Sequence, residues 1–196
     1  MHSIWKTSLR YTIFSFLLFG LVYPLALTGV AERLFPHKAD GSLIVRNGEV
    51  IGSKLLAQGF TSDRYFHPRP SAAGNGYDAA ESGASNLAQS NAILVHREQA
   101  DVDKLRKENP GVPVPEDLVT ASASGLDPDI TPDAAYFQAL RVAKARGWSV
   151  DVVRALIAEH TVGRTFGLLG EPRVNVLELN LVLDSRDPHK AVSVIP

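Results

Sequence analysis

The strongest hydrophobic pattern in the chain is an apolar run near its start. No charged side chain lies between Arg10 and Glu32. A helix rises about 1.5 Å per residue, so the about 21 residues from 11 to 31 span the roughly 30 Å hydrocarbon core of a bilayer. Backbone groups inside such a helix are satisfied internally. The pattern therefore predicts one transmembrane helix at 11–31, followed by one soluble domain at 32–196.

A cleaved secretory signal is the alternative interpretation of this run. Lys6 and Arg10 give it a positive start, and Gly29-Val30-Ala31 offers small residues for cleavage. The run is longer than the about 7 to 15 apolar residues of a typical signal core, which favours an uncleaved anchor. Pro24 lies inside the run, where its missing N–H group is expected to kink the helix.

The charges that flank the run predict its orientation. Lys6 and Arg10 precede it, whereas acidic residues offset the basic ones shortly after it: Glu32 and Asp40 against Arg33 and Lys38. Basic residues favour the cytoplasmic side. We therefore expect residues 1–10 to be cytoplasmic and residues 32–196 to lie outside the cytoplasm, in the periplasm where the cell has one.

Beyond the anchor, the pattern changes to short alternating runs and loops. Two such runs, 42–46 and 49–53, flank Asn47-Gly48, a dipeptide that favours the two-residue turn of a β-hairpin. Residues 61–91 are rich in small and polar residues without helical periodicity, yet aromatic residues recur there and just before it. This segment is predicted to be an ordered loop with aromatic anchors, at Phe60, Tyr65, Phe66 and Tyr77.

Three helices are predicted in the second half of the chain. An apolar stripe with charged flanks indicates a helix from about 89 to 108. Thr131-Pro132-Asp133 is a capping sequence for a helix that closes at Arg146-Gly147. Ser149 caps a further helix that runs to about His160, with a buried side predicted at Val152, Val153, Leu156 and Ile157.

The last strong pattern is an alternation between 174 and 184. Leu177, Leu179, Leu181 and Leu183 share one face if the segment is extended, so it is predicted to be a long strand. Helices and strands do not alternate regularly along the chain. This order favours an α+β domain with a small, mostly antiparallel sheet and about three helices over a doubly wound fold.

Composition narrows the possible partners. The formal net charge is −1 with acidic and basic residues interspersed, which argues against nucleic acid as a partner. Cysteine is absent from the sequence, so the chain has no disulfide, thiol nucleophile or thiolate metal site. About 160 residues after the anchor suffice for one hydrophobic core.

Signatures of catalysis and metal binding are absent from the sequence. It contains no GxSxG, HExxH, GxGxxG or P-loop motif, and its six histidines lie in separate neighbourhoods. Asp127, Asp129 and Asp133 could supply oxygen ligands to a hard cation, but their places at turns and a helix start favour a structural role that needs no ion. We predict no catalytic residue, no metal site and no intrinsic cofactor.

Two loops in the soluble domain have the compositions that most indicate a binding site. Residues 82–87 and 122–128 each combine small hydroxyl residues with a glycine, a composition that lets backbone amides converge. Such a geometry suits an anion, a phosphate or the backbone of a partner. Turn structure within the chain and a subunit contact are the alternatives.

These loops belong to a series of strings that resembles one family along nearly the whole chain. The chain resembles the C subunit of the potassium-transporting Kdp ATPase. The matching strings, in order, include YFHPRPSA (65–72), SGASNL (82–87), PEDLVT (115–120), SASGLDP (122–128) and GEPRVNVL (170–177).

The resemblance implies a single-pass subunit of the bacterial inner membrane. Its expected partners are a channel-like potassium-binding subunit, an ATP-hydrolysing P-type subunit and a small single-span subunit. The chain itself lacks the Asp-Lys-Thr-Gly sequence of a P-type catalytic site, so we expect a non-catalytic accessory subunit. A stand-alone, membrane-tethered periplasmic binding protein or hydrolase is the alternative.

The resemblance also implies a role as a catalytic chaperone that raises the ATP affinity of the hydrolysing subunit. The positions that correspond to the proposed nucleotide or partner contact are Ser82, Gly83, Ser85, Asn86 and Gln89. Two features conflict with nucleotide binding. The predicted orientation places this loop outside the cytoplasm, where ATP is scarce, and Ala84 adds a Cβ that hinders close approach of the backbone to a phosphate.

Overall fold

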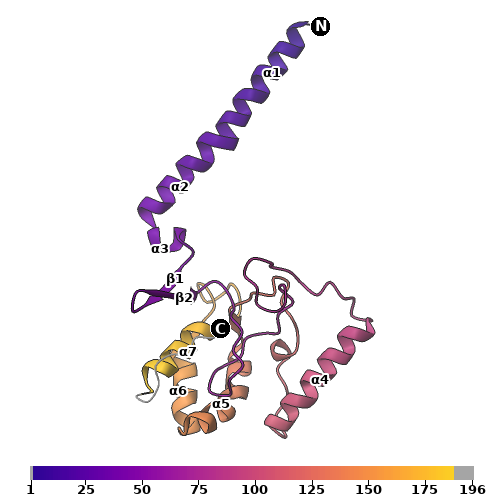
Figure 1. The fold of residues 1–196 in the computed structure, drawn as a ribbon, viewed down its shortest axis with the longest axis vertical. Helices are drawn as coiled ribbons and strands as arrows, with labels where there is room; N and C mark the ends of the chain where they lie inside the picture. Colours follow the sequence, from indigo (N-terminus) through magenta and orange to yellow (C-terminus); the bar gives the residue numbers. More distant parts are fainter. Residues whose placement is uncertain (1, 188–196) are drawn as a thin grey trace. The chain divides into compact units, whose positions relative to one another are not determined.

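The computed structural model describes residues 2–187, so the end of the predicted soluble domain, with His189, lies outside the described residues. The chain divides between Val50 and Ile51 into two compact units, which are described separately below. Figure 1 shows the helices and strands of both units. The first unit is dominated by one long apolar helix, and the second combines helices with a small sheet.

The apolar helix contains three consecutive segments. They are α1 (His2–Leu17), the π-helical segment η1 (Leu18–Val22) and α2 (Tyr23–Leu34). Residues Ser3–Leu34 are long and apolar enough to cross a membrane, and the predicted segment 11–31 lies inside them. The π turn precedes Pro24, and the Tyr23 amide bonds the Leu18 carbonyl five residues back. The proline is thus accommodated by a local change of hydrogen-bond pattern. The short helix α3 (Pro36–Ala39) follows.

The predicted hairpin is confirmed. Strands β1 (Leu43–Arg46) and β2 (Glu49–Ser53) pair as a two-stranded sheet. Asn47 and Gly48 connect them with φ angles of 55° and 83°. Positive φ at both turn positions is the requirement of a type I′ turn, which is why Asn-Gly predicted this element correctly.

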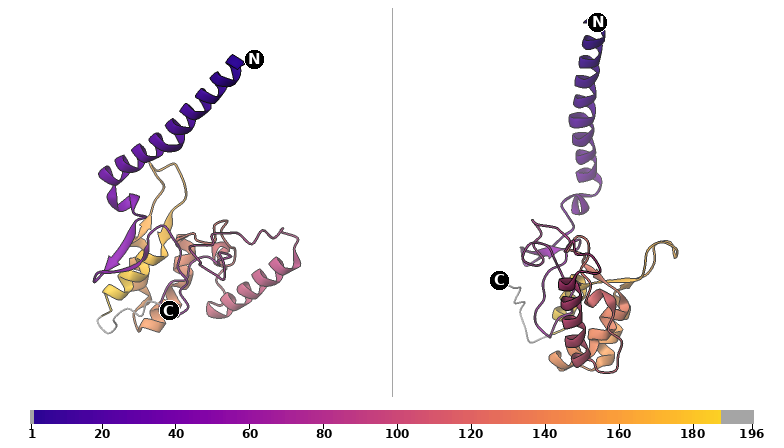
Figure 2. Two further views of the ribbon diagram at one scale, coloured as in Figure 1. Left: turned by 45° about the horizontal axis from the view of Figure 1, so that its top comes forward. Right: turned by 90° about the vertical axis from the view of Figure 1, so that its right-hand side faces the viewer.

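The second unit is a mixed α+β fold, as predicted. Its sheet has the order β3-β5-β4 and is antiparallel throughout, with β3 at Asp129–Ile130, β4 at Thr161–Val162 and β5 at Arg173–Asn175. Its helices are α4 (Ala92–Glu108), the 3₁₀ turn η2 (Glu116–Leu118), α5 (Pro132–Arg146), α6 (Val150–Glu159) and α7 (Val176–Ser185). Figure 1 and the left-hand view of Figure 2 show α4 to one side of the group formed by α5, α6 and α7.

The capping predictions for α5 and α6 are confirmed. The Thr131 side chain accepts a hydrogen bond from the Ala134 amide, and that of Ser149 accepts one from Val152. Gly147 ends α5 in the left-handed region, at φ 69°. The predicted buried side of α6 is correct except at Val152, which lies at the edge of the buried face and is 46% exposed.

The predicted strand at 174–184 is wrong. Extended structure ends at Asn175, and α7 follows at once. The Asn175 side chain accepts a hydrogen bond from the Glu178 amide, which caps the helix. The buried positions recur at helical rather than alternating spacing, and they are Val176, Leu177, Leu179, Asn180 and Leu183. Among the described residues of the second unit, α7 is therefore a fourth helix of ten or more residues beside α4, α5 and α6.

The core of the second unit lies among α5, α6, α7 and the central strand β5. Its largest fully buried side chains are Phe66, Leu156, Ile157, Leu179 and Leu183. Phe66 comes from the segment 54–91, which contains no helix or strand. The prediction of an ordered loop with aromatic anchors is therefore confirmed at its deepest anchor.

Candidate functional site

The two loops singled out in the sequence lie against each other. The Gly83 amide donates to the Ser124 carbonyl at 2.9 Å. The Ser82 hydroxyl donates to the same carbonyl at 3.0 Å. Two segments about forty positions apart thus form one site, which we call the paired loops (71–87 and 120–128). No sequence pattern indicated this pairing, because each loop was interpreted by its own composition.

Ser71 and Gly125 form the centre of the paired loops. The Ser71 hydroxyl donates to the Gly125 carbonyl at 2.6 Å and accepts the amides of Ala73 and Tyr77. Gly125 has φ 66°, and a Cβ at this position would lie 2.7 Å from both the Ala73 nitrogen and the Gly83 carbonyl oxygen. Only glycine fits here, because the backbones of the two loops approach too closely for a side chain.

Arg69 braces one side of the paired loops. Its guanidinium group contacts the Asp127 carboxylate at 3.1 Å and donates to the Thr120 hydroxyl at 3.3 Å. The Tyr77 hydroxyl donates to the Arg69 carbonyl at 2.9 Å. Burial raises the pKa of Tyr77 to about 12, so the phenol remains a protonated donor. The ion pair and the hydrogen bonds of Arg69 and Tyr77 therefore stabilise the conformation of the paired loops themselves.

The five candidate contact residues lie in one loop, but they differ in their hydrogen bonds and in their exposure to solvent. Ser82 and Gly83 use a hydroxyl and an amide in the pairing of the loops. Ser85 is half-buried, whereas Asn86 and Gln89 are exposed. Asn86 adopts a left-handed φ of 52°. Within residues 2–187, no hydrogen bond engages the side chains of Ser85, Asn86 or Gln89, so these three remain the accessible part of the candidate contact.

The acidic residues near these loops pair with arginines. Asp127 contacts Arg69, and Asp129 contacts Arg173 at 3.0 Å. Burial raises the pKa of Asp129, while Arg173 acts in the opposite direction. Across the described residues, no three His, Cys, Asp or Glu side chains gather as a metal-binding group. These acidic side chains therefore form ion pairs within the chain and stabilise the loops.

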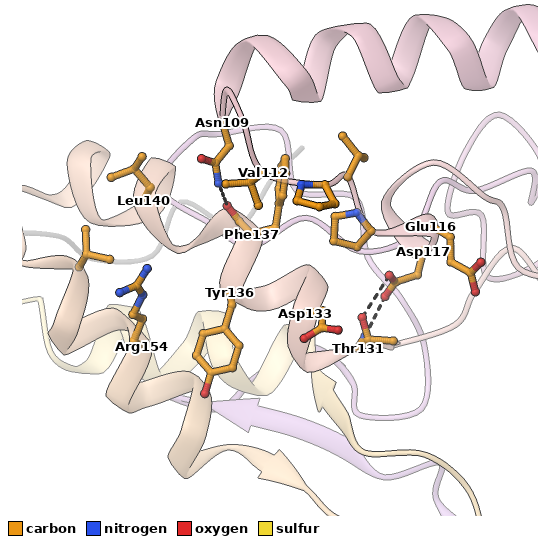
Figure 3. A pocket seen from close by; sticks show the side chains of 14 residues that line it. Asn109, Val112, Glu116, Asp117, Thr131, Asp133, Tyr136, Phe137, Leu140 and Arg154 are labelled. Atoms are coloured by element: carbon orange, nitrogen blue, oxygen red, sulfur yellow. Dashed lines mark hydrogen bonds between the residues drawn. The ribbon is translucent and has the colours of Figure 1, made fainter.

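A groove of about 850 Å³ is the feature that sequence reasoning missed. Figure 3 shows it between the proline-rich segment after α4 and helices α5 and α6. Its walls are largely apolar, with Tyr136 and Arg154 on one side. The carboxylate of Asp117 accepts both the amide and the hydroxyl of Thr131, so it serves the start of α5. The available signal was the alternation of Val and Pro at 112–115.

These features fit the class of membrane-anchored proteins that carry one mixed α+β soluble domain. A sequence model of the KdpC family, described as the K⁺-transporting ATPase c chain, matches residues 5–185. The chain therefore belongs to the KdpC family. Relatives that carry the name potassium-transporting ATPase KdpC subunit include three bacterial proteins. That of Acidobacterium capsulatum is 60% identical over 179 residues, 91% of this chain and 96% of the relative.

The other two relatives extend the match over similar lengths. That of Koribacter versatilis is 54% identical over 182 residues, covering 93% of this chain and 94% of its own. That of Myxococcus xanthus is 53% identical over 189 residues, covering 95% and 90% respectively. Residues 5–185, which the family model matches, include most of the apolar helix, the paired loops and α7.

Proposed function

We propose that this chain is a non-catalytic accessory subunit of an ATP-driven potassium transport complex, needed for its assembly and activity. The observation that carries the proposal is the family match over residues 5–185, which includes the anchor as well as the soluble domain. The paired loops support a structural role, because their charged and hydroxyl groups bond mainly to the chain's own backbone.

The proposed partners are a channel-like potassium-binding subunit, an ATP-hydrolysing subunit and a small single-span subunit. We place the complex in the bacterial inner membrane, with residues 1–10 cytoplasmic and the soluble domain periplasmic. The basic residues Lys6 and Arg10 before the apolar helix support this orientation.

The anchor provides the sharpest test of the proposal. Replacing residues 11–31 with an unrelated transmembrane helix of equal length keeps the chain in the membrane but removes its specific contacts. We expect the replaced chain to lose co-purification with the other subunits, and the complex to lose potassium-dependent ATPase activity. A deletion of 11–31 should give the same losses. Retention of both properties in both variants would reject the proposal.

Two narrower functions remain predictions. One is the catalytic chaperone role, in which Ser82, Gly83, Ser85, Asn86 and Gln89 contact ATP or the hydrolysing subunit. Loop pairing occupies the Gly83 amide, so ATP would have to be held by the accessible three. The other is a stand-alone tethered binding protein or hydrolase, which requires ligand affinity or activity in the full chain without other subunits.

A further inference from the structure

The segment that connects β4 to β5 extends away from the rest of the second unit. Figure 2 shows this segment, residues 163–172, leading away from the helices in the right-hand view. We call it the 163–172 arm. Thr165 and Leu169 pair across it, with amide-to-carbonyl distances of 2.8 and 3.0 Å. Phe166 and Gly167 close the turn with φ angles of 55° and 74°. The arm is thus a hydrogen-bonded turn of defined shape.

The tip of the arm exposes three large apolar side chains. Phe166 is 90% exposed, Leu168 80% and Leu169 64%. Phe166 adopts a left-handed conformation that bulky residues avoid, although Asn or Gly would adopt it with less strain. An aromatic ring that is strained and almost fully exposed contributes nothing to the packing of its own chain. It points to a contact with another molecule.

The charges around the tip restrict what that molecule can be. Residues 165–170 carry no charge. At the base of the arm, Arg164 contacts Glu171 at 2.6 Å, and Arg173 contacts Asp129 at 3.0 Å. Both guanidinium groups are therefore already paired, which disfavours an anionic lipid surface as the target. A neutral tip matches an uncharged apolar pocket on a protein.

The size of the tip also selects the partner. Three side chains cover far less than the about 800 Å² per partner of a standard protein interface, so the tip alone cannot hold a dimer of this chain together. A small contact suffices where a second attachment keeps the partners at high effective concentration. The apolar helix is such an attachment for any partner embedded in the same membrane.

We propose that the 163–172 arm inserts its apolar tip into an uncharged pocket on the external face of an integral membrane subunit of the transport complex. The proposal rests on the function proposed above, because it assigns the arm a partner within that complex. Phe166 and Leu168 supply the apolar contact, and the hydrogen-bonded turn presents them in one conformation.

The test uses the full chain co-expressed with the other three subunits. The double variant Phe166→Asn/Leu168→Asn should lower its association with the complex about tenfold or more, the effect of removing central apolar anchors. Ile93→Asn is the matched control, since Ile93 is an exposed apolar residue on α4, 69% exposed, and should leave association unchanged. Unchanged association of the double variant would overturn the proposal.

A crosslinking measurement identifies the partner. Benzoylphenylalanine in place of Phe166 should crosslink, on illumination, to an integral membrane subunit of the complex. Crosslinks to phospholipid only, or to a second copy of this chain only, would overturn the proposal. Phe166→Asn alone should not lower the melting temperature, because asparagine tolerates the left-handed turn, so weaker association is not unfolding. Failure of the unaltered chain to co-purify would instead reject the proposed function.

Discussion

Asn180 holds the backbone of Phe66 at both of its polar groups. The side-chain amide donates to the Phe66 carbonyl at 2.9 Å and accepts the Phe66 amide at 2.8 Å. Gln138 does the same for the next residue, His67, at 3.1 and 2.8 Å. Two side chains from α7 and α5 therefore take the place of a neighbouring strand. They fix a segment that has no secondary structure of its own.

Replacing Asn180 with leucine should strongly destabilise the second unit. The substitution keeps the branched shape of the side chain but leaves a buried amide and a buried carbonyl without partners, which costs about 3 kcal/mol or more. Urea unfolding of the full chain in detergent, followed by Trp148 fluorescence in a Trp5→Phe background, measures the loss. Gln99→Leu on the exposed face of α4 is the control and should change stability by less than about 0.5 kcal/mol.

Stability should depend on pH through His67. Burial, and then the neighbouring Arg141, lower the pKa of His67 to about 4. The unfolded chain binds the proton near pH 6.5. The contribution of neutral His67 to the free energy of unfolding is therefore fully present above that pH, decreases as the pH falls toward 4 and changes no further below it.

The loss through His67 should amount to about 2 kcal/mol. Unfolding of His67→Asn, compared with the unaltered chain at pH 7 and pH 4.5, isolates this contribution, because the other titrating groups are common to both. The variant should show the smaller decrease. His96→Asn, which changes an exposed histidine on α4, should behave like the unaltered chain. An identical decrease in all three would refute the assignment.

Gly125 should tolerate alanine far less than Gly111 does. Both glycines have positive φ, 66° and 83°. A Cβ at Gly111 meets nothing within 4 Å, whereas one at Gly125 collides with the backbone of Ala73 and Gly83. We expect a loss of roughly 1 kcal/mol for Gly111→Ala and roughly 3 kcal/mol for Gly125→Ala, measured by urea unfolding. Equal losses would mean that the paired loops separate without cost.

The nucleotide role predicts labelling of the full chain by azido-ATP. If the accessible residues hold ATP, Asn86→Ala/Gln89→Ala should reduce labelling about tenfold, as expected for lost polar contacts. Ser90→Ala, at an exposed neighbouring position, should not reduce it. Comparing sealed cells with inverted vesicles identifies the side that binds. Without specific labelling in either preparation, the nucleotide role is excluded and the assembly role is unaffected.

The proposed orientation can be tested by thiol labelling, because the chain contains no cysteine. Ser85→Cys and Gln89→Cys place single thiols on the candidate contact loop, and Gln89 is the better position because it is exposed. A membrane-impermeant maleimide should modify both from outside intact spheroplasts. Ser3→Cys, which lies before the anchor and keeps Lys6 and Arg10, should react only after the membrane is opened. The reverse pattern would invert the topology.

Local signals were sufficient for much of the fold. Asn47-Gly48, Thr131-Pro132 and Ser149 each determine a turn or a helix start through bonds to residues at most three positions away. Such features can be predicted from sequence because all the interacting groups are neighbours. The ordered loop was predictable in kind, through its aromatic residues, but not in what holds it.

The segment 174–184 could not be assigned from its pattern. Leucines at every second position match a strand, while Val176, Leu179 and Leu183 match one face of a helix equally well. The overlooked signal was Asn175 followed by Glu178, a helix-capping arrangement. The buried face of α7 belongs to a core cluster that includes Phe66, Val142 and Leu156, and these partners lie outside the segment.

Partners that are distant in sequence account for the remaining misses. Arg146 was interpreted only as a residue that closes a helix, yet its side chain is just 1% exposed. It contacts Asp184 at 2.8 Å and the Arg64 carbonyl at 2.7 Å, and its guanidinium lies 5.0 Å from the Tyr65 ring. The pairing of the two loops is of the same kind. Neither follows from spacing, because the partners belong to different elements.

The bond between Phe66 and Asn180 also constrains when the second unit can close during synthesis. A ribosome makes Phe66 more than a hundred residues before Asn180, and loops of that length close late. Until α7 emerges, the Phe66 amide and carbonyl lack their partner, although Gln138 of α5 is already available to His67, so the core around Phe66 stays incomplete. Polypeptides that stop short of α7 should therefore be rapidly degraded, whereas the finished chain becomes resistant to proteases in one late step.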